Sequence, residues 1–75
     1  MFVFSGQRLR EVREAQDKPR ELLALESDLA ASTITALETG HAKPSRAALL
    51  RLATALGVPA GELVEPDPAA DVVAP

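Results

Sequence analysis

The chain has 75 residues, no cysteine and one histidine, which suffices for one small domain and excludes a disulfide framework and a multi-histidine metal site. Its formal charge of −3 is unevenly spread, because residues 1–60 hold all eight Lys and Arg against seven acids and residues 61–75 hold four acids. No apolar run is long enough to span a membrane, so a cytoplasmic protein without a membrane partner is expected. A core this small favours self-association, and we expect a homodimer.

Two helices are predicted in the first third of the chain. Ser5 is the expected N-cap of a helix that runs to about Gln16. Asp17 is expected to cap the second helix, because Pro19 fits a first turn where no amide hydrogen is needed. This helix is predicted to end near Glu26.

A third helix is predicted from about Ala30 to Glu38, after a sharp turn that contains Asp28. Asp tolerates the left-handed conformation that such a turn requires. The small side chain of Ala24 lets the second and third helices cross closely, and Gly40 is expected to end the third helix as a left-handed cap. This pattern predicts a helix-turn-helix motif.

A fourth helix is predicted from the N-cap Ser45 to Gly57, with an apolar stripe on one side. A short fifth helix is predicted over about Ala60 to Val64. Residues 1–4 are expected to form a flexible arm, and the proline-punctuated acidic residues 66–75 a disordered tail. The folded domain then covers residues 5–65. Inward-facing side chains are expected at Leu9, Val12, Arg13, Leu23, Ala24, Ile34, Leu37, Leu49, Leu52, Ala53 and Leu56, and Leu29 is expected to fill the turn between the second and third helices.

The segments LREVREAQ, ELLAL and STITALETGHAKPSRAALLRLATALGVP resemble the XRE (Cro/cI phage-repressor) family of helix-turn-helix proteins. The resemblance extends from Gln7 to about Val64. It implies an all-α, five-helix, lambda-repressor-like fold whose third helix, about residues 30–38, enters the major groove of double-stranded DNA. It also implies a homodimer that regulates transcription, as a repressor.

The outward face of the third helix is made of small residues. If Ile34 and Leu37 point inward, the candidate base-contacting residues are Ala31, Ser32, Thr35 and Ala36. None of them can form the long bidentate contacts that Arg, Lys, Asn and Gln make with base edges, so direct readout is expected to be poor. Thr33 is expected to border the core.

The resemblance assigns phosphate contacts to Arg20, at the start of the second helix, and to Lys43 and Arg46 near the loop after the third. For each of them the alternative is an ordinary solvated side chain. Arg13 and Glu38 match a pair that is structural in the family and ties the first helix to the end of the third. No catalytic residue is expected, because the chain lacks a nucleophile with an adjacent base and a glycine-rich phosphate loop. Cofactors and metals are not expected either.

Two classes of function remain. The first is a sequence-specific regulator that binds duplex DNA as a homodimer. The second is a degenerate helix-turn-helix module, or an antitoxin-like protein, that binds a protein partner through the Phe2–Phe4 arm or the acidic tail. Binding to duplex DNA that weakens with salt distinguishes the two.

Overall fold

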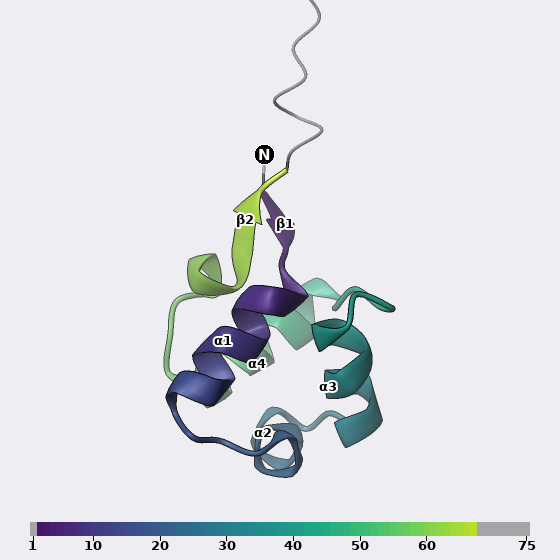
Figure 1. The fold of residues 1–75 in the computed structure, drawn as a ribbon, viewed down its shortest axis with the longest axis vertical. Helices are drawn as coiled ribbons and strands as arrows, with labels where there is room; N and C mark the ends of the chain where they lie inside the picture. The colour runs from purple at the N-terminus through teal and green to yellow at the C-terminus, as the bar shows by residue number, and fades with distance from the viewer. Residues whose placement is uncertain (1, 68–75) are drawn as a thin grey trace, which may run out of the picture.

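The structure is a computed structural model that describes residues 2–67, which form four α-helices, a 3-10 helix and a two-stranded sheet (Figure 1). The α-helices are α1 (Gly6–Ala15), α2 (Arg20–Ser27), α3 (Ala31–Glu38) and α4 (Arg46–Leu56). The other elements are β1 (Phe2–Phe4), the 3-10 helix η1 (Ala60–Leu63) and β2 (Val64–Pro66). The helix-turn-helix predicted from the sequence is formed by α2 and α3.

The first and last elements of the described chain pair with each other. β1 and β2 are antiparallel, with Phe2 opposite Pro66 and Phe4 opposite Val64. The predicted flexible arm is therefore wrong for residues 2–4, and the predicted all-α, five-helix fold is corrected. The expected fifth helix is the single 3-10 turn η1, followed by β2. The predicted boundary between residues 65 and 66 falls inside β2, and residues 68–75 of the predicted tail lie outside the described residues.

The turns between helices follow from a few local contacts. The Ser5 hydroxyl accepts the Arg8 amide hydrogen at 3.2 Å, which confirms the predicted N-cap of α1. The predicted cap at Asp17 is wrong. This residue lies in a left-handed turn (φ +51°), and its amide donates to the Glu14 carbonyl, so it ends α1 instead of starting α2. Pro19 is the N-cap of α2, and its missing amide hydrogen has no cost there.

The other helix ends agree with the predictions from the sequence. Asp28 is left-handed (φ +57°) between α2 and α3, as expected, and Ala30 starts α3 without a side-chain cap. Gly40 (φ +82°) follows α3, and the Ala36 carbonyl accepts the amide hydrogen of His41 at 2.9 Å, a Schellman-type end. For α4, Ser45 is the N-cap and Gly57 (φ +67°) the C-cap.

All the helices and η1 share one core. Nine apolar side chains are buried in it: Leu9, Leu23, Ala24, Ile34, Leu37, Leu52, Ala53, Leu56 and Leu63. Eight of these were expected from the helical spacing, whereas Leu63 was not, because η1 is too short to show a period. Val12 and Leu49 are partly buried against this core.

The N-terminal end of α1 lies directly against the C-terminal end of α3. A methyl group in place of the Gly6 hydrogen would clash with the Leu37 carbonyl oxygen. The close approach therefore requires glycine at this position. It fixes where α1 crosses the end of α3, next to the surface that the sequence assigns to DNA.

Candidate nucleic-acid interface

The outer face of α3 is exposed and carries no charged side chain. Ile34 and Leu37 are buried in the core, as the spacing predicts. Ser32 and Thr35 are exposed, while Ala31 and Ala36 are half-buried at the edges of the face. These four candidate residues therefore line one continuous side of the helix, because they follow its period.

Hydroxyl groups on this face differ in their availability to a ligand. Thr35 Oγ1 donates to the Ala31 carbonyl at 3.2 Å, and Thr39 Oγ1 donates to the Thr35 carbonyl at 2.8 Å. Within residues 2–67, the hydroxyls of Ser32 and Thr33 form no hydrogen bond. The expectation that Thr33 borders the core is wrong, since its side chain is exposed. Thr33 is thus a further candidate, and one that the regular three-and-four spacing of the buried residues does not identify.

Two cationic side chains follow the C-terminal end of α3. Lys43 lies in the loop after α3 and Arg46 is the first residue of α4, and both are exposed. Neither takes part in an ion pair with any other described residue. Since Ser45 lies between them and caps α4 through its bond to the Ala48 amide at 3.1 Å, the backbone that carries both is held in place. As far as the described part of the chain is concerned, both cations can pair with an anionic ligand.

Arg20 differs from these two because it already has a partner. Its Nε donates to Glu38 Oε1 at 3.0 Å, and its side chain is 37% exposed. The sequence assigned Arg20 to a phosphate and Glu38 to a structural pair with Arg13. The structure brings all three side chains together.

Glu38 is the centre of this cluster, and its side chain has no exposed surface. Arg13 Nε donates to Oε2 at 2.6 Å and Arg13 Nη2 to Oε1 at 3.1 Å, while Arg13 Nη1 donates to the Lys18 carbonyl at 2.9 Å. Burial alone would raise the pKa of Glu38, but hydrogen bonds from Arg13 and Arg20 outweigh it and lower the pKa below its ordinary value. The hydrogen bonds that Arg13 donates to Glu38 raise the pKa of Arg13 above its ordinary value. Glu38 is therefore an anion whose charge is compensated inside the protein.

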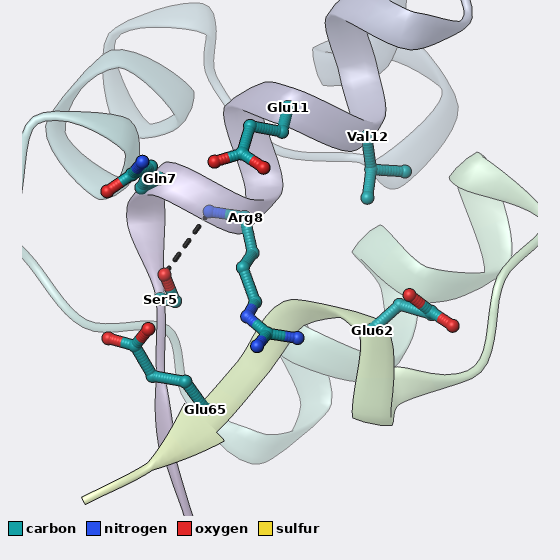
Figure 2. Close-up of a pocket in the computed structure, with 7 residues that line it drawn as sticks. All are labelled: Ser5, Gln7, Arg8, Glu11, Val12, Glu62 and Glu65. Carbon is teal, nitrogen blue, oxygen red and sulfur yellow. Dashed lines mark hydrogen bonds between the residues drawn. The ribbon is translucent and has the colours of Figure 1, made fainter. Parts of the chain in front are cut away.

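Acidic side chains gather elsewhere, around a pocket of about 340 Å³ between α1, η1 and β2. Figure 2 shows the Arg8 guanidinium extending between Glu62 and Glu65, with Glu11 nearby on α1. None of the lining residues belongs to α3 or to the loop that follows it. The negative charge of this pocket is thus separate from the candidate interface.

The described residues contain no cluster of three or more His, Asp or Glu side chains that could hold a metal ion. In the same part of the chain, every helix is too short or too polar to cross a membrane. Every buried polar side-chain atom within residues 2–67 has a hydrogen-bond partner. Within residues 2–67, Lys43 and Arg46 are thus the exposed cations that lie next to the uncharged outer face of α3.

Comparisons with known proteins identify the family of the fold. The helix-turn-helix family matches residues 9–63. The structure is similar to the restriction-modification controller protein C.AhdI from Aeromonas hydrophila, with 43% identity, a TM-score of 0.76, and coverage of 77% of this chain and 88% of that one. It is also similar to the clp gene regulator ClgR from C. glutamicum, with 26% identity, a TM-score of 0.73, and coverage of 77% and 75%. No match is found among curated proteins.

Proposed function

Because this chain belongs to the helix-turn-helix family of DNA-binding regulators, we propose that it represses transcription as a homodimer whose α3 helices enter the major groove of duplex DNA. A protein of this family is a regulator and not an enzyme. The two similar structures are those of a controller protein and a gene regulator, which supports a regulatory role here.

One observation carries the proposal: the exposed side of α3 is free of negative charge, and beside it lie two cations that form no ion pair with any residue in 2–67. The only acidic residue of α3, Glu38, is buried and compensated by two guanidinium groups. Lys43 and Arg46 are exposed just beyond it. A phosphate backbone can therefore approach this side without meeting a carboxylate of α3.

Phosphate and base contacts have different candidates. We assign phosphate contacts to Lys43 and Arg46, and to the part of the Arg20 guanidinium that Glu38 leaves open. Base contacts fall to Ala31, Ser32, Thr35 and Ala36, which offer methyl and hydroxyl groups. Without long side chains, sequence preference should rest on thymine methyls and on the shape of A·T-rich or deformable sites.

A homodimer fits both the size of the core and the family. If the two α3 helices lie about 34 Å apart, one turn of duplex, the site is near-palindromic. The cytoplasm remains the compartment that we propose, as the sequence led us to expect.

The test is selection of bound duplexes from a random pool, followed by anisotropy titration of the selected duplex and an unrelated duplex at low and moderate salt. We expect a near-palindromic, A·T-rich site and affinity that falls with salt. The matched control is Arg10→Ala, which removes an exposed arginine that pairs with Glu14 on α1. If the wild type binds no duplex even at low salt, the alternative function, a protein-interaction module built on this fold, replaces the proposal.

A further inference from the structure

The outer edge of β1 has main-chain groups that pair with nothing else in residues 2–67. The Ser5 amide donates to the Leu63 carbonyl at 2.9 Å. Ser5 and Leu63 are therefore a hydrogen-bonded pair next to the two strands, and this pair shows which pairs further along the strands are hydrogen-bonded. Because hydrogen-bonded and non-hydrogen-bonded pairs alternate in antiparallel strands, Val3 and Glu65 exchange hydrogen bonds. The amide and carbonyl groups of Phe2 and Phe4 therefore point away from β2, and within residues 2–67 nothing else bonds them.

The outer edge of β2 is less able than that of β1 to pair with an additional strand. By the same alternation its outward residues are Val64 and Pro66, and Pro66 has no amide hydrogen. In contrast, β1 has no proline, no charged residue and no bulge, which are the features that protect an edge strand from pairing. Between the two edges, only β1 offers a donor and an acceptor at two alternate positions.

One large apolar side chain of β1 is also left exposed to solvent. Phe2 and Phe4 lie on one face of the strand, because side chains alternate. Phe4 is half-buried against the core, whereas Phe2 is 67% exposed. Figure 1 shows β1 and β2 extending away from the helices, so the helices leave this end of the strand open.

We propose that β1 pairs with β1 of a second copy of this chain, antiparallel about a two-fold axis at Val3, to give a four-stranded sheet in the order β2-β1-β1-β2. The axis at Val3 places position 2 of each copy opposite position 4 of the other, where the outward main-chain groups exchange two hydrogen bonds. Because both positions are Phe, each facing pair is aromatic. Each exposed Phe2 ring then packs on the partner's Phe4 ring. This inference rests on the homodimer proposed above and names its interface.

Cysteine cross-linking tests the register, and the chain has no native cysteine to interfere. In the proposed sheet the two copies of position 3 form a non-hydrogen-bonded pair with Cα atoms about 4.5 Å apart, within disulfide range. Leu50, exposed on α4 and outside the proposed sheet, is the comparison site, because Phe2→Cys would itself remove an aromatic ring from the interface. In a glutathione buffer, Val3→Cys should form at least about tenfold more covalent dimer than Leu50→Cys at equal concentration.

Leu50 on α4, which is 53% exposed, is the matched control, because it tests whether a different exposed apolar side chain forms the dimer interface. Phe2→Lys should raise the dimer dissociation constant measured by sedimentation about tenfold. One substitution removes two cross-strand aromatic contacts, because both copies in the dimer carry it. Leu50→Lys should leave the dissociation constant unchanged. Circular dichroism checks that each variant is folded.

These measurements contain no DNA, so they separate the two proposals. A dimeric wild type in which Leu50→Cys cross-links and Val3→Cys does not would overturn the strand pairing and leave the homodimer in place. A wild type that is monomeric at every accessible concentration would overturn the homodimer itself. Cross-linking at Val3 together with dissociation by Phe2→Lys supports the pairing whatever the outcome of the DNA titrations.

Discussion

Arg20 and Glu38 connect the first residue of α2 to the last residue of α3 through a contact of 3.0 Å between Nε and Oε1. Arg13, on α1, holds the same carboxylate through two further hydrogen bonds. One buried carboxylate therefore joins the three helices that set the angle of the helix-turn-helix. Arg20, which the sequence assigned to DNA, therefore lies in the same cluster as Arg13 and Glu38, which the sequence assigned to a structural pair.

Replacing Glu38 should destabilise the fold strongly. Glu38→Ala leaves the Arg13 guanidinium without its partner in a site where its side chain is only 10% exposed. The expected loss is about 3 kcal/mol of unfolding free energy, because a buried charge becomes uncompensated. Chemical denaturation measures it, with Glu14→Ala on the exposed face of α1 as the control. An unchanged unfolding free energy together with lost DNA binding would assign Glu38 to the ligand instead.

The same cluster predicts loss of stability in acid. The lowered pKa of Glu38 means that the folded protein releases this proton more readily than the unfolded chain, whose Glu pKa is about 4.3. The stabilisation is fully present above that pH and is lost as the pH falls through the lower pKa of the folded state. Melting curves at several pH values between about 7 and 3 should show a steeper decline for the wild type than for Glu38→Gln. Parallel declines would contradict this prediction.

Cationic and hydroxyl side chains should affect DNA binding differently. Lys43→Ala and Arg46→Ala should weaken binding to specific and unrelated duplexes by similar factors, and flatten the salt slope by about one for each phosphate group that a subunit no longer neutralises. Ser32→Ala or Thr35→Ala should change sequence preference more than general affinity. Anisotropy titrations at two salt concentrations measure both effects. Cationic variants that bind like the wild type would remove these side chains from the interface.

Arg20→Ala should affect both DNA binding and stability, whereas Lys43→Ala should affect DNA binding alone. It removes a proposed phosphate contact and also one of the hydrogen bonds to Glu38. We therefore expect weaker duplex binding together with a lower melting temperature, whereas Lys43→Ala should leave the melting temperature unchanged. Loss of stability should be smaller than for Glu38→Ala, because Arg13 still pairs with the carboxylate.

Gly6→Ala should destabilise the protein although alanine is the better helix former. Its methyl group would overlap the Leu37 carbonyl oxygen, so α1 and α3 would have to move apart, at a cost of about 2 kcal/mol. The matched control is Gly61→Ala, because a methyl group there meets nothing within 4 Å. Denaturation midpoints of the two variants should move differently, and equal midpoints would show that the close approach of α1 to α3 is easily relieved.

Local chemistry explains why most of the helices were predictable from the sequence. Ser5, Ser45 and Gly57 act within a few residues of their own helix ends, and the buried leucines repeat with the helical period. These signals are complete within a short stretch of chain. They also sufficed for the family, whose motif is continuous from α2 to α4.

The errors have a different origin. The pairing of β1 with β2 joins residues that are about sixty positions apart, and three-residue strands carry no visible period. Asp17 fits both a helix cap and a left-handed turn, and the hydrogen bonds to the end of α1 decide between them. The phosphate assignment of Arg20, which rests on the resemblance, stays a prediction, but its contact with Glu38 could not be predicted because the two residues are 18 positions apart in the sequence.

Closure of the sheet also determines when the fold can be completed during synthesis. β1 is the first described element to leave the ribosome, but its partner β2 is the last, so β1 waits unpaired while the four helices are made. Leu63, which completes the core, arrives just before β2. A nascent chain that stops before residue 64 therefore exposes an apolar Phe2-Val3-Phe4 segment with both edges open, a form prone to aggregation.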